Sequence, residues 1–172
     1  YFASHAYGNA TGADLWQALT QKTELDLPKI MSTWLNCSGY PVVSVKKIGN
    51  DLLLEQRQFF TDPSVTSDQL WPIPLMSNYP ELPALMTQKR LILKDYTSLR
   101  QKNGSALQLN VNNNAHFIVD YSPELLGDLL KKSPQTDTLT RFSLLQALVL
   151  LAQAQVISLP QVLELAANFK KD

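Results

Sequence analysis

The sequence predicts an α+β protein: a helical hairpin, then an antiparallel immunoglobulin-like β-sandwich, then a helical array. Three observations lead to this prediction. Apolar residues recur at helical spacing up to residue 39, strand-like alternation with turn residues runs from 40 to 121, and helical spacing returns after that. We therefore expect three parts, at residues 1–39, 40–121 and 122–172.

The first part carries two helix signals. Thr11 and Asp14 have the spacing of a capping box, which opens a helix running to about residue 23. Asp26 caps a second helix, Gly39 supplies a left-handed residue at its end, and Pro41 forbids continuation. Two helices alone have too little core to bury their apolar faces, so we expect the sandwich or a further domain to cover them. These faces consist of Leu15, Trp16 and Leu19, and of Leu27, Ile30, Met31, Trp34 and Leu35.

In the middle part, the alternation of residues predicts six short strands separated by turn residues. This pattern is typical of a sandwich or barrel. Val42, Val43 and Val45 are β-branched and favour the first strand. Two prolines restrict the third strand to a sheet edge. The expected strands are 41–48, 52–60, 71–75, 90–96, 107–111 and 116–121, with turns at 49–51, 103–104 and 112–114.

The last part predicts three helices. Ser122 and Pro123 give a strong start signal for the first helix, a second begins at Asp137 or Thr138, and a third begins near Ser158. Their expected buried residues are Leu125, Leu126, Leu129 and Leu130; Leu144, Leu145, Leu148, Leu151 and Ala152; and Val162, Leu163, Leu165, Ala166 and Phe169.

Charge and cysteine content narrow the classes of partner and compartment. Fifteen basic and fifteen acidic residues balance, so neither nucleic acid nor an anionic membrane is an expected partner. The single Cys37 forms no internal disulfide, which favours a reducing, cytoplasmic location. We interpret the glycosylation sequons at Asn9, Asn36 and Asn103 as chance. The first residue is Tyr1 rather than methionine, so we expect a piece of a longer chain.

Several motifs resemble the zinc metallo-aminopeptidases of the aminopeptidase N family. Residues 9–16 resemble its N-A-x-x-x-D-L-W stretch, 34–41 its W-x-x-x-x-G-Y-P element, and 71–74 its W-x-I-P. Residues 109–121 are similar to its L-N…R-V-N-Y stretch. The chain departs from the family pattern at Gln58, Ile118, Asp120 and Gln146, where the family has arginine, arginine, asparagine and an acidic residue.

The resemblance implies the end of a catalytic domain, a sandwich domain, and the start of a C-terminal helical domain. In the family, zinc is held by an H-E-x-x-H helix and a later glutamate. This chain has only His5 and His116, and neither belongs to such a motif. We therefore expect no catalytic, cofactor-binding or metal-binding residue here. Zinc and the removal of N-terminal amino acids from peptides would belong to the parent enzyme.

The expected role is a scaffold that holds the catalytic and helical domains in a fixed relation. Its expected partners are the rest of the parent polypeptide and, through exposed apolar faces, further copies of the chain. Trp16, Trp34, Trp71 and the helix around Leu144 are the expected interface or core residues. Cys37, without a histidine and an acidic partner, is interpreted as a small packed side chain.

Two alternatives stay open. A free-standing sandwich that binds carbohydrate or protein would need Trp71, Tyr79 and Tyr96 to be exposed. An intact metalloenzyme would need a zinc site built around His5 and His116, which the spacing of these residues does not favour.

Overall fold

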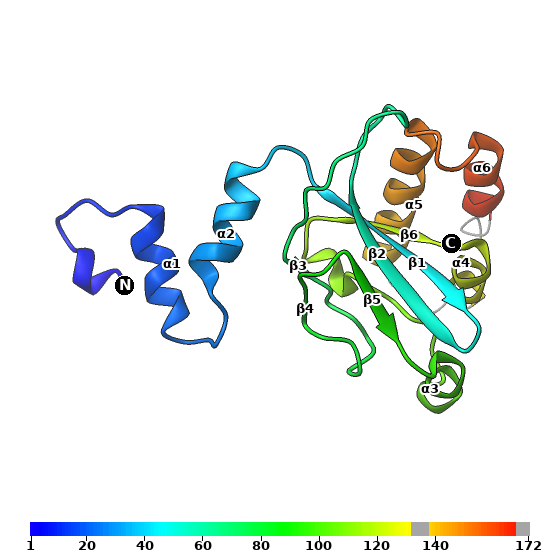
Figure 1. Ribbon diagram of the computed structural model, residues 1–172, viewed down its shortest axis with the longest axis horizontal. Coiled ribbons are helices and arrows are strands. Elements are labelled where there is room, and N and C mark those ends of the chain that lie inside the picture. Colours follow the sequence, from blue (N-terminus) through cyan, green and yellow to red (C-terminus); the bar gives the residue numbers. More distant parts are fainter. Residues whose placement is uncertain (132–137, 168–172) are drawn as a thin grey trace. The chain divides into compact units, whose positions relative to one another are not determined.

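The structure is a computed structural model that describes residues 1–131 and 138–167 (Figure 1). The chain forms two compact units, Tyr1–Ser38 and Gly39–Asp172. The α+β class expected from the sequence is confirmed, since six α-helices and a four-stranded sheet lie within the described residues.

The first unit is a pair of helices, as expected. Helix α1 spans Gly12–Thr20 and α2 spans Leu27–Asn36, after a 3-10 turn η1 at Ala3–His5. The capping box is confirmed, because Thr11 N donates to Asp14 Oδ2 at 2.7 Å and Asp14 N donates to Thr11 Oγ1 at 3.4 Å. Gly39 has the expected positive φ of 82°, but α2 ends earlier than expected, at Asn36.

The larger unit is built on a sheet with strand order β5-β2-β1-β6. The strands are β1 Pro41–Ile48, β2 Asp51–Gln58, β5 Arg90–Leu93 and β6 Ile118–Tyr121. β1 and β2 form an antiparallel hairpin, and β5 pairs antiparallel to β2. β6, however, pairs parallel to β1, so the expectation of a purely antiparallel sheet is wrong. A hairpin would make neighbouring strands antiparallel. The long connection between β5 and β6 instead lets β6 run in the same direction as β1.

A second, very small sheet pairs β3, Ile73–Pro74, with β4, Leu85–Met86. The expected segment 71–75 therefore contains an edge strand, but a shorter one. Pro72 and Pro74 lack the N–H groups that would extend the ladder. The backbone continues to pair irregularly, since Leu75 N donates to Ala84 O and Asn110 N donates to Leu75 O.

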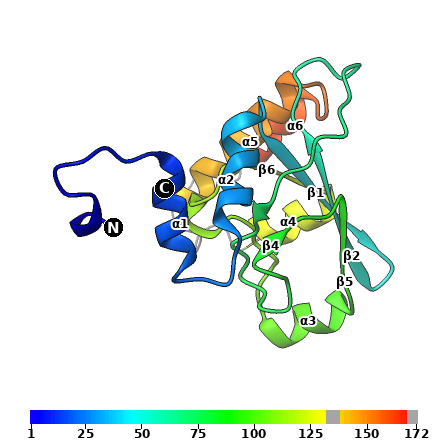
Figure 2. The same ribbon diagram turned by 60° about the vertical axis from the view of Figure 1, so that its left-hand side comes forward.

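The core lies on both faces of the four-stranded sheet. On one face Val43, Val45, Leu52 and Leu54 are fully buried. Gln56 is buried on the same face and binds the backbone of Trp71 through both ends of its amide, at 2.9 and 3.1 Å. On the other face Val42 and Ile118 form a buried cluster with Leu151 of α5, the helix Thr138–Gln153. Figures 1 and 2 both show α5 alongside β6.

Two of the expected strands need correction. Segment 90–96 is a strand only to Leu93, and helix α3 follows at Tyr96–Asn103. Asp95 has a φ of 54°, a left-handed conformation that ends the strand and starts the helix. Segment 107–111 forms no ladder. Its backbone instead bonds to loops and side chains, for example from Leu109 N to Tyr121 Oη and from Val111 N to Met76 O.

The C-terminal helices begin as the sequence predicts. Helix α4 spans Pro123–Leu130 and buries the four expected leucines. Helix α5 spans Thr138–Gln153 and buries Leu148 and Leu151, and α6 spans Leu159–Ala167 and buries Val162. Leu163 was expected inside but is 65% exposed. Asp137, Phe169 and the side chain of Leu165 lie outside the described residues.

Candidate functional site

A loop rich in asparagine, residues 110–116, forms one wall of a cleft in the larger unit. Asn110 fixes this asparagine loop from inside, since its Oδ1 accepts from Ala115 N and its Nδ2 donates to Ala115 O, both at 2.8 Å. Its Nδ2 also donates to Asn113 Oδ1 at 3.2 Å. Asn110, Asn112 and Asn113 all have φ between 51° and 63°. Asparagine tolerates this left-handed region better than other side chains, so the composition of the loop follows from its shape.

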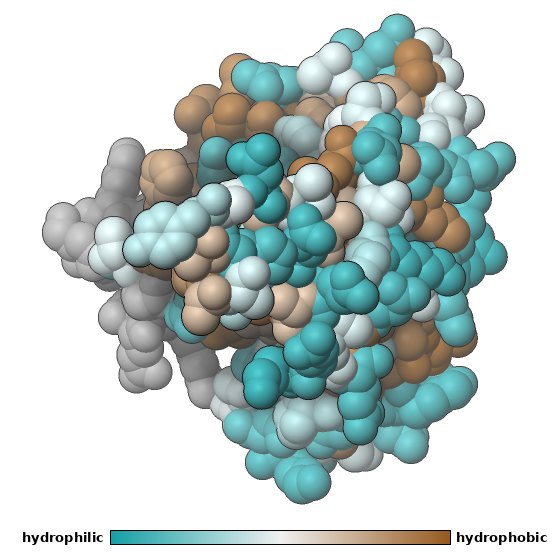
Figure 3. All heavy atoms as spheres, turned by 90° about the vertical axis from the view of Figure 1, so that its left-hand side faces the viewer, coloured by the Kyte–Doolittle hydropathy of each residue, from teal (hydrophilic) through white to brown (hydrophobic). Residues whose placement is uncertain are grey.

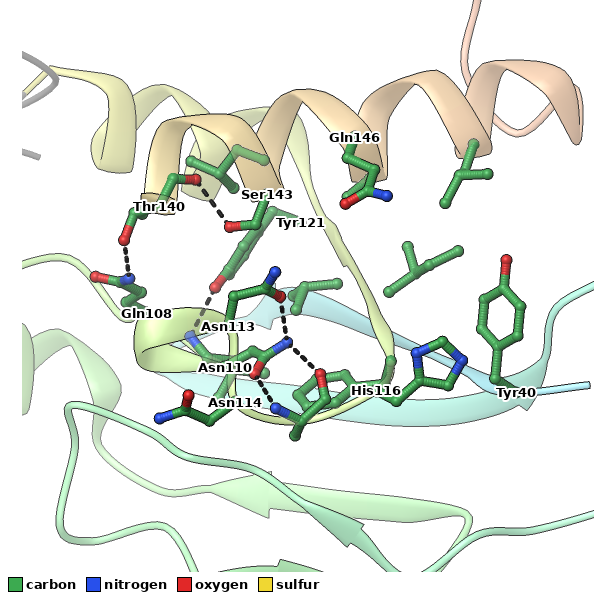
Figure 4. Close-up of a pocket in the computed structure, with 18 residues that line it drawn as sticks. Tyr40, Gln108, Asn110, Asn113, Asn114, His116, Tyr121, Thr140, Ser143 and Gln146 are labelled. Carbon is green, nitrogen blue, oxygen red and sulfur yellow. Dashed lines mark hydrogen bonds between the residues drawn. The ribbon is translucent and has the colours of Figure 1, made fainter. Parts of the chain in front are cut away.

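The cleft lies between this loop, β6 and α5, and Figure 4 shows its lining. Its volume is about 400 Å³, within the range of ~300–1,000 Å³ typical of small-molecule sites. Amide, hydroxyl, imidazole and apolar groups line it, and the described lining residues include no aspartate, glutamate, lysine or arginine. The polar members are Tyr40, Gln108, Asn110, Asn113, Asn114, His116, Tyr121, Thr140, Ser143 and Gln146.

At one end of the cleft, hydrogen bonds connect α5 to the segment before the asparagine loop. Gln108 Nε2 donates to Thr140 Oγ1 at 3.0 Å, and Ser143 Oγ donates to Thr140 O at 2.9 Å. Thr140 is buried. Its hydrogen bond with Gln108 ties the start of α5 to the segment before the asparagine loop. Beneath them, the buried phenol of Tyr121 accepts from Leu109 N at 2.8 Å (Figure 4). Burial raises the pKa of Tyr121, so this phenol stays neutral.

The other end of the cleft is aromatic. The ring of Tyr40 stacks on Phe59, with centroids 5.4 Å apart and an interplanar angle of 19°. The imidazole of His116 lies 4.8 Å from the same ring, tilted by 51°. His116 is exposed, contacts Tyr40 and precedes β6, which begins at Ile118, so the strand expected at 116–121 starts two residues later than predicted.

A second, more charged depression of about 760 Å³ lies over β2 and the loop that follows it. There Asp120 faces Arg57 at 3.9 Å, and Glu55 pairs with Arg90 at 2.8 Å. Burial raises the pKa of Asp120, and the Arg57 guanidinium opposes that rise. Asp120 therefore pairs with Arg57 here, while Ile118, which replaces the family's arginine, lies in the core.

The residues singled out from the sequence are divided between the two units. His5 lies in the first unit, where its Nδ1 is 3.1 Å from Tyr1 O, and His116 lies in the larger unit. Cys37 is a free, half-buried thiol. Among the described residues, no three His, Cys, Asp or Glu side chains lie close enough to hold a metal ion.

The large aromatic side chains of the two units differ in how deeply they are buried. Trp71, Tyr79 and Tyr96 are 1%, 1% and 4% exposed, which confirms Trp71 as a core residue. The Tyr79 hydroxyl donates to Ser105 O at 2.7 Å, and burial raises the pKa of both tyrosines. Trp16 and Trp34 in the first unit are only half-buried.

Sequence reasoning missed the cleft. It predicted a turn at 112–114, but not that Asn110 and Gln108 organise its wall or that Thr140 anchors the helix opposite. The run N-V-N-N-N was the available signal, because repeated asparagine marks left-handed backbone. The contact between Gln108 and Thr140 joins segments 32 residues apart and had no local signal.

Large apolar side chains are exposed in both units. In the first unit they include Phe2 and Leu35, and in α5 and α6 they include Phe142, Leu159 and Leu163. Figure 3 shows apolar residues at the surface among hydrophilic ones on the face that it draws. No helix in the described part of the chain is long and apolar enough to cross a membrane.

Comparison with known proteins shows similarity over the whole chain. Aminopeptidase N from Lactococcus lactis subsp. cremoris is 39% identical over 173 residues, which covers 100% of this chain. Aminopeptidase N from Lactobacillus helveticus is 43% identical over 171 residues, or 98% of the chain. This sequence is part of an aminopeptidase N-like protein.

The resemblance in the sequence motifs is thereby confirmed. Tricorn protease-interacting factor F2 from Thermoplasma acidophilum is also similar to this aminopeptidase N-like region, at 30% identity over 175 residues. The chain spans only about a fifth of each of these relatives, 20% of the two aminopeptidases and 21% of the factor. No family model matches the chain.

Proposed function

We propose that this region is a non-catalytic scaffold of a zinc-dependent aminopeptidase, which removes N-terminal amino acids from peptides. The carrying observation is that the whole chain matches a fifth of aminopeptidase N, while its sequence contains no H-E-x-x-H motif. The zinc site and the chemistry then belong to the rest of the parent polypeptide.

In this proposal residues 1–39 end the catalytic domain, 40–121 form the sandwich domain, and 122–172 begin the helical domain. The four-stranded sheet and the β3–β4 pair would be the two layers of the sandwich. The helix pair buries no side chain fully, which supports a role in docking against other parts of the parent. The sheet unit, with its buried valines and leucines, would supply the rigid side of the bridge. A cytoplasmic location remains a prediction.

The rival function, a free-standing module for carbohydrate or protein, depends on exposed aromatic rings. Trp71, Tyr79 and Tyr96 are buried, so they offer no such platform. The exposed apolar side chains of α1, α2, α5 and α6 support contact with more protein instead, either the parent chain or another copy.

A chimera tests the scaffold. The matching fifth of Lactococcus aminopeptidase N is replaced by this chain, and hydrolysis of an aminoacyl anilide and zinc content are measured. We expect bound zinc and activity close to that of the parent. Replacing Trp71 by alanine in the chimera should lower activity without removing zinc. An inactive, zinc-free chimera would contradict the proposal.

The 172-residue chain provides the matched assay. We expect neither stoichiometric zinc nor turnover from it, under conditions in which the chimera is active. Zinc together with turnover from the isolated chain would contradict the non-catalytic role and point to His5 and His116.

A further inference from the structure

We propose that the cleft between the asparagine loop and α5 binds an extended, uncharged stretch of peptide with small or apolar side chains. This inference goes beyond the scaffold role and does not depend on it. It is carried by the volume of the cleft, by its uncharged lining, and by amide groups that the chain itself leaves unused.

Two side-chain amides approach the cleft from opposite walls. Gln146 points from α5 toward the loop, and Asn113 points from the loop toward α5 (Figure 4). Asn113 uses its Oδ1 to accept from Asn110. Within the described residues, neither its Nδ2 nor the Gln146 amide bonds to another part of the chain, and both side chains are exposed. An amide carries a donor and an acceptor, so it matches the N–H and C=O of a peptide unit.

The rest of the lining limits the side chains that such a peptide carries. Leu144, Ala147 and Leu150 lie three residues apart on α5 and form an apolar strip beside these amides. The described lining residues offer no charge to pair with. A peptide side chain with a charge would lose its hydration without compensation, whereas a small or apolar one would gain buried area.

A sugar fits the cleft less well. Carbohydrate sites generally present an open aromatic face, but the Tyr40 ring is stacked on Phe59. The His116 imidazole also lies against this ring, at 4.8 Å. The aromatic end of the cleft is therefore packed against its own neighbours, and the hydrogen-bonding amides are the groups that face the space.

The test is a nuclear magnetic resonance titration of the labelled full chain with the blocked peptide acetyl-Ala-Val-Ser-Ala-amide. We expect shifts in the side-chain NH2 signals of Asn113 and Gln146 and in the backbone of the asparagine loop. Acetyl-Ala-Glu-Lys-Ala-amide should bind at least about threefold more weakly, and maltose should cause no shift there.

Two variants locate the site. Gln146→Ala removes one amide, and Asn113→Asp removes the free donor while keeping the oxygen that Asn110 binds. Each should weaken peptide binding about three- to tenfold, the loss of one ordinary hydrogen bond. Gln153→Ala, exposed on the same helix, should leave affinity unchanged. No shifts with millimolar peptide, shifts with maltose instead, or unchanged affinity in both variants would overturn the proposal.

Discussion

The two units of this chain differ in how far their apolar side chains are buried. Of residues 1–38 none is buried, although α1 and α2 carry well-formed caps and apolar faces. In the larger unit, Val42, Val43, Val45, Leu52 and Leu54 are completely buried. Local signals therefore suffice to form a helix, but stability comes from the packing of its apolar face. A region can be correctly folded locally and still need cover from elsewhere.

The largest expected difference between the units comes from their tryptophans. Trp71→Ala should lower the unfolding free energy of the larger unit by about 3–5 kcal/mol, because it removes a fully buried ring. Trp34→Ala, in the half-buried position of α2, should cost less than about 1 kcal/mol. Urea unfolding followed by circular dichroism measures both. Equal losses of unfolding free energy in the two variants would contradict the difference in burial between the units. Ile73→Val serves as a milder core variant if Trp71→Ala does not fold.

The next effect concerns the buried amide of Gln56. Gln56→Ala leaves Trp71 N, Trp71 O and Gln88 O without this partner, so we expect a loss of about 2 kcal/mol or more. The exposed Gln101→Ala is the control and should change stability by less than about 0.5 kcal/mol. The same urea curves report it. A neutral Gln56→Ala would mean that water replaces the amide.

A smaller and local effect is expected at the capping box of α1. Thr11→Ala should weaken that helix by about 1 kcal/mol. The hydrogen bonds from Thr11 hold the pKa of Asp14 below its usual value. Their stabilisation is present above the unfolded pKa and is lost as pH falls through the lower, folded pKa. The protection factors of the α1 amides against hydrogen exchange should therefore fall in acid, while those of β1 and β2 should be unaffected by Thr11→Ala.

The smallest effect has the opposite sign. Burial raises the pKa of Asp120, so the folded chain binds its proton more tightly than the unfolded chain. The associated stability is present below the unfolded pKa and is lost as pH rises through the raised, folded pKa. Asp120→Asn should therefore raise the unfolding free energy slightly at pH 7 and flatten its pH dependence. Asp68→Asn, fully exposed, is the matched control. Destabilisation by Asp120→Asn would show that the contact with Arg57 dominates.

The features that the sequence predicted correctly depend on residues that are close together in the chain, and the features that it missed depend mostly on contacts between distant segments. The caps at Thr11 and Asp26, strand β1 and the buried leucines of α4 depend on neighbouring residues and were all found. Helix α3 was missed because few apolar residues mark it, although Gly104 with φ 65° is a typical C-terminal signal. The parallel pairing of β6 and the Gln108–Thr140 contact depend on the chain path over long distances, which periodicity does not encode.

The most direct test is amide hydrogen exchange, compared between the 172-residue chain and the same residues within the Lactococcus chimera. We predict that amides of α1 and α2 exchange quickly in the isolated chain and become protected in the chimera. Amides of β1 and β2 should exchange slowly in both. Equal protection of α1 and α2 in the two proteins would contradict the scaffold account, because the helix pair would then gain no cover from the parent enzyme.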